Sequence, residues 1–238
     1  MISIQQITRR ERERMMRRKE IMDAARTVFA HKGFNDAKLE DVAELAEFGK
    51  GTIYNYFDNK EGLFKSVLED SFEMIKGIAE ESFRAEIPFQ EKVERFIRAE
   101  LTFFFDNLDM IQLMMRESHH LKTGNPLMHL FPQLLEIIAD TISAEQKKGG
   151  IMQTGDAMGL AVMLFNMLIG QCSCRVYTRL HENLHATDDG GPAPVVDMAQ
   201  VSLQKLFGDM TKSQIAQEIE AATTLIHTVY FHGIAPRA

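Results

Sequence analysis

The segment from Leu39 to Phe57 constrains the fold of this chain more than any other stretch. Its first half has apolar residues at i, i+3, i+4 and i+7, a spacing that predicts a short amphipathic helix: Leu39, Val42, Ala43 and Ala46. Four residues follow as a turn, and the same spacing then returns in Ile53, Tyr56 and Phe57. Two short helices joined by a tight turn predict a helix-turn-helix, a motif that reads DNA.

The second helix of this segment separates core residues from residues that can contact DNA. Ile53 and Phe57 fall on the apolar side and are predicted to be buried. The outward positions carry types that bind phosphates and base edges: Lys50, Thr52, Tyr54 and Asn55. Gly51 has no side chain to hold the backbone away from a phosphate.

The charge of the chain divides unevenly along its length. The formal net charge is -7, but residues 1–65 hold 13 Lys and Arg against 11 Asp and Glu, which leaves -9 for the remainder. Residues 1–19 alone carry seven basic and two acidic side chains. This gradient predicts a small DNA-binding domain with a basic arm on an acidic body, although any single arginine of the arm is equally well explained as a solvated helix position.

Composition excludes several other classes of protein. No run of 18 apolar residues indicates a membrane span, and the N-terminus lacks the apolar centre of a signal peptide, so we expect a soluble, cytoplasmic protein. Cys172 and Cys174 are two residues apart in an apolar stretch, which favours reduced core cysteines. No phosphate-binding loop, dinucleotide motif or serine nucleophile elbow is found, so we expect no cofactor and no enzyme.

Helical periodicity continues through the rest of the chain, which predicts an all-α fold. We expect a three-helix N-terminal domain over residues 1–60 and a larger helical C-terminal domain over residues 61–238. A long helix from Asn59 to about Arg84 would link them. The other predicted helices cover residues 13–32, 89–107, 110–122, 127–148, 156–184 and 195–210, followed by a last helix near 212–232.

Two stretches of the N-terminal domain carry a family resemblance. RRKEIMDAARTVFAHKGF (17–34) and LEDVAELAEFGKGTIYNYFDNKEGLF (39–64) make the chain resemble the TetR/AcrR family of bacterial transcriptional regulators. The resemblance implies a repressor that leaves a near-palindromic operator when it binds a small effector. It also implies a set of DNA-binding residues: Lys38, Lys50, Gly51, Thr52, Tyr54, Asn55, Tyr56 and Lys60. Lys60 would bind phosphate, and the spacing of Tyr56 also suits the core.

Three residues depart from the family pattern. Lys38 stands where a Ser or Thr usually caps the second helix, so it can contact phosphate but cannot supply that cap. Glu47 and Gly49 replace the usual turn glycine and the Ser that starts the reading helix. We therefore expect Gly49 to provide the unusual backbone angle of the turn.

The C-terminal domain is rich in Met and Phe, which suits a large apolar ligand because methionine side chains are pliable and polarizable. Plain hydrophobic core is the more frequent explanation of any one of these residues. The predicted lining, with Arg116 and His119 as polar anchors, is Phe103, Phe104, Met114, Met115, Arg116, His119, Met128, Phe131, Met158 and Phe165.

The last helices are the predicted homodimer interface, over about residues 156–184 and 212–232. In the final helix five apolar residues step by 4, 3, 4 and 3: Ile215, Ile219, Ala222, Ile226 and Val229. So narrow a seam is typical of helices packed nearly parallel to a partner. The alternative is that the seam packs only on its own chain.

The segment from His181 to His185 provides the alternative function. HENLH matches a zinc motif in which two histidines one helical turn apart bind the metal and the Glu acts as a base. A metal-binding protein or a metal-dependent hydrolase is therefore the competing hypothesis. Short motifs also occur by chance, and we assign no metal ligand.

Overall fold

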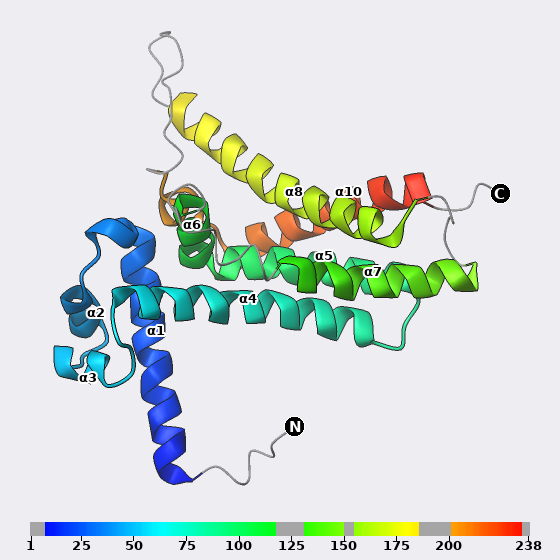
Figure 1. Cartoon of the computed structure of the whole chain (residues 1–238). Helices are drawn as coiled ribbons and strands as arrows, with labels where there is room; N and C mark the ends of the chain where they lie inside the picture. Colours follow the sequence, from blue (N-terminus) through cyan, green and yellow to red (C-terminus); the bar gives the residue numbers. More distant parts are fainter. Residues whose placement is uncertain (1–7, 118–130, 150–154, 186–200, 235–238) are drawn as a thin grey trace. The chain divides into compact units, whose positions relative to one another are not determined.

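A computed structural model describes residues 8–117, 131–149, 155–185 and 201–234 of the chain (Figure 1). All regular secondary structure within these ranges is α-helical, which confirms the predicted fold class. In chain order the helices are α1 (Arg9–Asp36), α2 (Leu39–Leu45), α3 (Lys50–Tyr54), α4 (Lys60–Arg84), α5 (Phe89–Asp106), α6 (Leu108–Glu117), α7 (Phe131–Lys148), α8 (Ala157–His185), α9 (Leu203–Phe207) and α10 (Lys212–Ile234).

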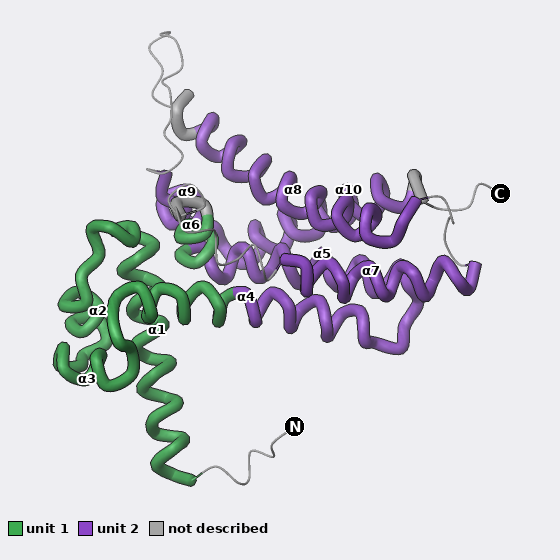
Figure 2. The backbone as a smooth tube through the Cα atoms, in the orientation of Figure 1, with its two compact units in different colours: residues 1–71, 109–126 green, residues 72–108, 127–238 purple. Residues whose placement is uncertain are grey.

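The chain divides into two compact units, which Figure 2 colours separately. The head unit comprises residues 1–71 and 109–126, and the body unit comprises residues 72–108 and 127–238. α4 belongs to both, because the division falls between Ser71 and Phe72. The linking helix predicted from the sequence therefore exists, while a functional boundary at residue 60 stays a prediction.

Helix α1 begins earlier than the sequence predicted, while its helical backbone is broken at Gly33, directly after the predicted end at residue 32. Thr8 caps its start through a capping box, in which the Thr8 hydroxyl accepts from the Glu11 N–H while the Glu11 carboxylate accepts from the Thr8 N–H. Gly33 interrupts the helix with φ 76°, and a further turn then runs to Asp36. Burial begins only at Ile21, so the first three turns of α1 stand exposed.

Aromatic packing forms the core of the head unit. The Phe29 ring lies edge-on to Phe64 with 5.1 Å between centroids, and Phe34 lies 4.8 Å from Phe64. Ile53 and Phe57 are buried, as the spacing predicted. Asn59 caps α4 by accepting a hydrogen bond from the Gly62 N–H at 2.7 Å. These contacts fix α3 on a rigid base.

The body unit is built from α5, α7, α8 and α10, with α7 packed on α8 and α10 packed on α5. Phe131 of α7 lies between Phe72 and Phe165, with centroid distances of 6.0 and 5.4 Å. Asp156 caps α8 by accepting from the Gly159 N–H at 2.8 Å, at the start of the helix predicted over 156–184. The continuous apolar surfaces of these helices explain why they assemble as one core.

Some predicted helix limits need correction. The helix predicted over 195–210 is reduced to α9 within the described residues, because Ser202 caps it at Leu203 and it ends at Phe207. The helix predicted from residue 110 starts earlier, at Leu108. The predicted loop HATDDGGPAP spans residues 185–194, of which 186–194 lie outside the described part of the chain.

The predicted dimer seam of the last helix packs on its own chain. Ile219, Ala222 and Ile226 are buried where α10 lies along α5, so the alternative interpretation was the correct one for these residues. Their burial is physically expected, because α5 offers α10 an equally apolar stripe that includes Val93 and Ile97. Leu225 and Val229 are instead exposed.

A second apolar surface therefore remains on the last helices. We call it the α8–α10 face; its members are between 36% and 59% exposed: Met158, Val162, Ile169, Tyr177, Leu225 and Val229. Residues Ala157–Glu182 are long and apolar enough to cross a membrane by length and composition, but the core helix of a soluble protein passes the same test. The same side of α8 also carries exposed Asn166 and Ser173.

Candidate nucleic-acid interface

The turn between α2 and α3 differs from the prediction in one residue. Glu47 adopts φ 56°, the left-handed conformation, whereas Gly49 has an ordinary φ of -68° and caps α3. Glu47 therefore provides the unusual angle that we expected from Gly49. Its N–H still donates to the Glu44 carbonyl at 3.1 Å, and the next N–H, of Phe48, donates to the Ala43 carbonyl at 2.9 Å. These two bonds close the helix end and offset the cost of the angle.

Lys38 begins α2 without a side-chain cap, as its chemistry requires. The Asp41 carboxylate instead reaches back and accepts from the Lys38 N–H at 3.1 Å. Lys32 also pairs with Asp41, and together these contacts hold the pKa of Asp41 below its usual value. The Lys38 side chain stays exposed and can reach a phosphate.

The outward surface of α3 contains most of the predicted DNA-binding residues. Lys50, Gly51, Tyr54 and Asn55 are exposed, while Thr52 and Tyr56 are half-buried. A side chain at Gly51 would meet nothing within 4 Å, so the backbone there is open to approach. The structure brings these six residues together on one short helix and its last turn, which is the arrangement that major-groove reading needs.

Lys50 is already engaged in this structure. Its ammonium is hydrogen-bonded to the Glu40 carboxylate, which raises the pKa of Lys50 and lowers that of Glu40. Both side chains are exposed, so solvent screens the pair. A phosphate at this position would compete with Glu40 for the same cation.

Lys60, which we expect to bind phosphate, contacts the protein backbone in this structure. Its ammonium donates to three backbone carbonyls at the end of α1, those of Phe34, Asn35 and Ala37, at 2.8, 3.1 and 3.1 Å. An ammonium has three donors, so all of them are used. The cation also lies 4.6 Å from the centre of the Phe34 ring. Lys60 ties the start of α4 to the α1–α2 connection.

Lys60→Met should therefore destabilise the head unit without changing contacts to DNA. Loss of three charge-assisted hydrogen bonds is expected to lower the free energy of unfolding by about 1–3 kcal/mol. Urea unfolding measures this, and the salt dependence of DNA binding should match that of the wild type. Lys65→Met, which removes an exposed α4 cation, is the control. A phosphate contact by Lys60 would instead reduce the salt dependence.

Two arginines outside the predicted set lie against this site. The guanidinium of Arg14 lies 6.0 Å from the centre of the Tyr56 ring, and that of Arg18 lies 5.1 Å from the centre of the Phe57 ring. Both contacts join α1 to the end of the reading segment. The spacing of these arginines with Ile21 and Ala25 was a usable signal, because all four fall on one helical stripe.

The residues predicted to bind a ligand do not form one cavity among the described residues. Phe104 packs against Phe105 and Phe207, whereas Phe131 and Phe165 meet elsewhere in the body core. Met158 is exposed on the α8–α10 face. Met114 is half-buried in the head unit. The remaining predicted positions lie outside the described residues or have side chains that do: Met115, Arg116, His119 and Met128.

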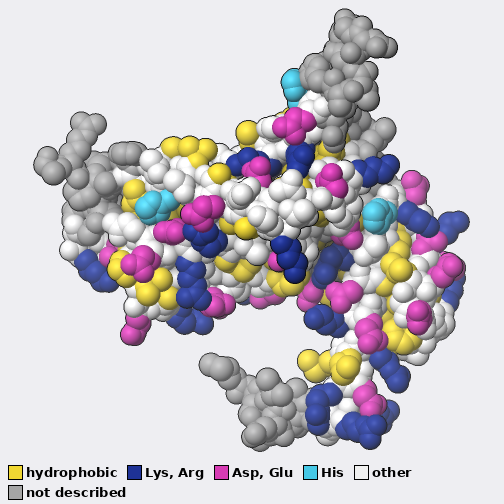
Figure 3. Space-filling view, turned by 180° about the vertical axis from the view of Figure 1, so that it is seen from behind, with side chains coloured by type: hydrophobic (Ala, Val, Ile, Leu, Met, Phe, Trp, Pro, Cys, Tyr) yellow, Lys and Arg dark blue, Asp and Glu magenta, His cyan; other side chains and the backbone are white. Residues whose placement is uncertain are grey.

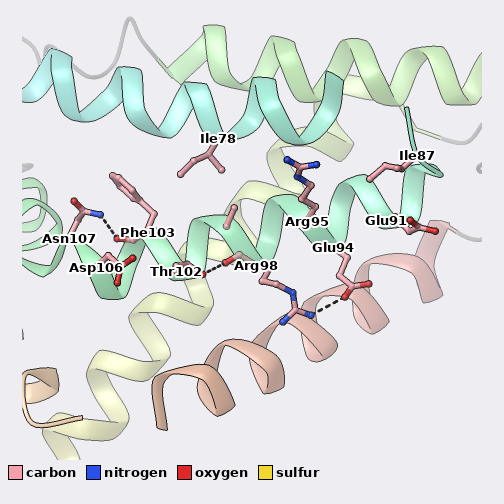
Figure 4. A pocket seen from close by; sticks show the side chains of 11 residues that line it. Ile78, Ile87, Glu91, Glu94, Arg95, Arg98, Thr102, Phe103, Asp106 and Asn107 are labelled. Carbon is pink, nitrogen blue, oxygen red and sulfur yellow. Dashed lines mark hydrogen bonds and ion pairs between the residues drawn. The ribbon is translucent and has the colours of Figure 1, made fainter. Parts of the chain in front are cut away.

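The body unit does contain a groove of about 720 Å³ between α4 and α5 (Figure 4). Ile78, Ile87 and Phe103 give it an apolar floor, and Phe103 is the only predicted ligand residue that lines it among those described. Thr102 and Asn107 turn their polar groups back onto α5, where they donate to the Arg98 and Phe103 carbonyls. The groove therefore presents fewer free polar groups than its lining residues would suggest. Charged side chains border it.

The competing metal motif gains no support from the structure. His181 and Glu182 are exposed in the last turns of α8, and Glu182 pairs with Arg179 at 3.7 Å. The His185 side chain lies outside the described residues. No group of three or more possible metal ligands occurs among the residues that the structure describes.

Comparison with known proteins shows which family of helix-turn-helix domains this candidate interface matches. Residues 21–67, which span the end of α1 to the start of α4, match the model of the bacterial regulatory proteins of the tetR family. The N-terminal domain of this chain belongs to the TetR family. The matched residues include Glu47 and Gly49, the two turn residues that depart from the usual TetR pattern. These two departures therefore do not prevent the match.

Relatives extend the TetR similarity beyond this domain to different degrees. The HTH-type transcriptional regulator YhgD of Bacillus subtilis is 39% identical over 87 residues, which cover 37% of this chain and 46% of the relative. The HTH-type transcriptional repressor NicS of Pseudomonas putida is 28% identical over 137 residues, covering 56% and 64%. The chain thus spans about half the length of the curated relatives that it matches.

A solved structure shares the fold over most of the chain. The transcriptional regulator FadR of Bacillus subtilis, in complex with stearoyl-CoA, superposes with a TM-score of 0.62 over 88% of this chain and 97% of its own. The two sequences are 17% identical. At that identity the similarity establishes a shared fold, including the helical body.

Proposed function

We propose that this protein is a ligand-responsive transcriptional regulator that represses genes from a near-palindromic operator. The observation that carries the proposal is the reading segment, a TetR-type helix-turn-helix whose outward residues are exposed and whose core residues are buried. NicS, a repressor by name, is similar to more than half of this chain. The protein would act in the cytoplasm, where its DNA lies.

Repression from a palindromic operator requires two head units. We propose that a homodimer supplies them. The α8–α10 face supports this, because exposed apolar stripes of this extent on adjacent helices usually mark an interface. The two copies would place their reading helices in successive major grooves, roughly 34 Å apart or a multiple of that distance. Dimerisation would thus use the predicted helices, but of the predicted α10 seam the α8–α10 face includes only Val229.

The effector is proposed to be small and predominantly apolar. The α4–α5 groove has a volume in the range of small-molecule sites and an apolar floor. FadR, which shares the fold, holds stearoyl-CoA. A ligand beside α4 would shift this helix and change the separation of the two reading helices, and DNA tolerates little change in that separation. The alternative function predicted from the HENLH segment is a metal-dependent hydrolase.

Selection of duplexes from a random library by the purified protein tests DNA recognition. We expect a near-palindromic consensus that is bound on the order of 10³-fold more tightly than mixed-sequence duplex. Tyr54→Ala and Asn55→Ala should each weaken binding to the selected duplex by about 10-fold or more, with little effect on mixed-sequence duplex. Gln90→Ala, an exposed change in the body unit, is the control. Failure to select any consensus would rule out the proposed function.

The proposed effector is tested by its effect on the affinity of the protein for the selected duplex. Stearoyl-CoA is the first probe, and native mass spectrometry identifies any molecule that copurifies. Binding should lower the affinity for DNA, and Phe103→Asp, which charges the groove, should remove the response. A metal assay with His181→Ala tests the alternative, since a hydrolase would lose activity in that variant.

A further inference from the structure

The exposed start of α1 is a separate surface that the reading segment does not explain. Residues 9–20 form three turns of regular helix in which every side chain is exposed. They contain seven basic and three acidic side chains. Glu11 is occupied by the capping box, and Glu13 pairs with Arg9 at 2.8 Å, so few carboxylates remain to neutralise the arginines.

The arrangement of these arginines follows the core stripe of α1. The buried residues Ile21, Ala25 and Val28 recur at three- and four-residue steps along one side of the helix. The same steps continue toward the N-terminus as Arg18, Arg17, Arg14 and Arg10. The stripe thus changes from apolar to cationic where α1 extends beyond the protein core.

The cationic stripe is adjacent to the proposed DNA-reading site. Arg14 and Arg18 lie over the rings of Tyr56 and Phe57, which fixes this side of α1 against the end of the reading segment. Figure 3 shows Lys and Arg side chains gathered over this end of α1. The capping box keeps the arm helical up to Thr8, so its arginines are held at fixed spacing.

We propose that this arginine stripe binds the DNA phosphate backbone that flanks each operator half-site. The proposal rests on the proposed function and adds a second contact surface to it. Charge complementarity and continuity with the reading segment both favour DNA as the molecule that binds the stripe. Arginine suits this role because its planar guanidinium donates two parallel hydrogen bonds to a phosphate. The contact adds affinity without adding sequence information.

The opposite side of the same helix provides a matched control. Arg9, Arg12 and Lys19 fall on a second stripe that points away from Tyr56 and Phe57, together with exposed Met16. The full-length variant Arg10→Gln/Arg14→Gln/Arg17→Gln and the control Arg9→Gln/Arg12→Gln/Lys19→Gln each remove three positive charges. Glutamine keeps a high helix propensity, and circular dichroism checks that both arms stay helical. A third variant with lysine at positions 10, 14 and 17 keeps the charge.

The test measures the salt dependence of binding to the selected duplex and to a mixed-sequence duplex of equal length. Each lost phosphate contact should reduce the slope of log affinity against log salt by about 0.9. The stripe variant should therefore lose about 2–3 in slope for each bound head and on the order of 10–100-fold in affinity at ~0.15 M salt, on both duplexes. The control should lose much less, and the lysine variant should recover most of the slope.

Equal losses in the stripe variant and the control would overturn the proposal, because only the total charge would then matter. A stripe variant that changes oligomeric state while its salt slope is unaltered would overturn it too, and would assign the stripe to a second copy of the chain. Wild-type protein that shows no preference for the selected duplex would refute the proposed function itself. Retained preference with no stripe effect would refute the arm contact alone.

Discussion

Ile169→Glu/Leu225→Glu should convert the proposed homodimer into a monomer that binds the selected duplex only weakly. Both side chains are about half exposed in the middle of the α8–α10 face, so the variant places two carboxylates where each copy would bury apolar surface. Burying unpaired charges costs several kcal/mol per interface. Affinity for the selected duplex should fall by about 10²-fold or more, because two linked heads bind far more tightly than one.

Light scattering after size-exclusion chromatography measures the change in mass. The matched control, Gln133→Glu/Ala144→Glu, adds two carboxylates at exposed positions of α7 in the same unit. It should remain dimeric and keep its affinity for DNA. A double variant that still shows the mass of two chains would place the interface elsewhere on the body unit.

Glu100→Gln should stabilise the protein increasingly as the pH rises from 5.5 to 7.5. Glu100 lies on α5, and its Oε1 atom is buried without a hydrogen-bond partner among the described residues. Burial raises the pKa of Glu100 to about 8, and burial together with the nearby Glu100 raises the pKa of the Cys172 thiol to about 12. A carboxyl of this kind is kept protonated in the folded state, which glutamine imitates without a charge.

The direction of this effect follows from linkage between protonation and folding. Below pH ~4.5 both states carry the proton, so Glu100 adds no pH dependence. Between about 4.5 and 8 the unfolded state is ionised while the folded state is not, so wild-type stability falls by about 1.4 kcal/mol per pH unit. Above pH ~8 the folded state ionises as well and the loss levels off.

Urea unfolding at pH 5.5 and 7.5 should show the advantage of the variant growing by about 2–3 kcal/mol. Glu91→Gln, an exposed change on the same helix, is the control and should show no such growth. An advantage that is equal at both pH values would mean that Glu100 is ionised in the folded state or has gained a partner.

The helices were largely predictable because their signals are local. The i, i+3, i+4 spacing predicted the buried positions of Ile53 and Phe57. The helices predicted to start at Asn59 and at residue 156 do start there, where the short polar side chains of Asn59 and Asp156 form the caps. Apolar spacing alone did not reveal every helix limit. Thr8 and Glu11 extend α1 well beyond the start that apolar spacing suggested, because a capping box needs no hydrophobic contact.

At the candidate site the sequence predicted which side chains are exposed but not which atoms they contact. Tyr54 and Asn55 fall on the polar side of α3 and are exposed, as the spacing predicted. Lys60 has the same chemistry as a phosphate-binding lysine, yet three carbonyls at the end of α1 occupy it. Those carbonyls are more than twenty residues away in sequence, so no pattern near Lys60 reveals them.

The sequence alone determined the helical class of this protein, the TetR-type reading segment and the uneven charge, because each depends on residues close together in the chain. Tertiary structure decided which apolar stripe is covered. Ile219 and Ile226 have the spacing of a dimer seam, but α5 buries them, while Leu225 and Val229 on the same helix are left exposed. Periodicity shows that a helix has an apolar side, whereas only packing shows which surface covers it.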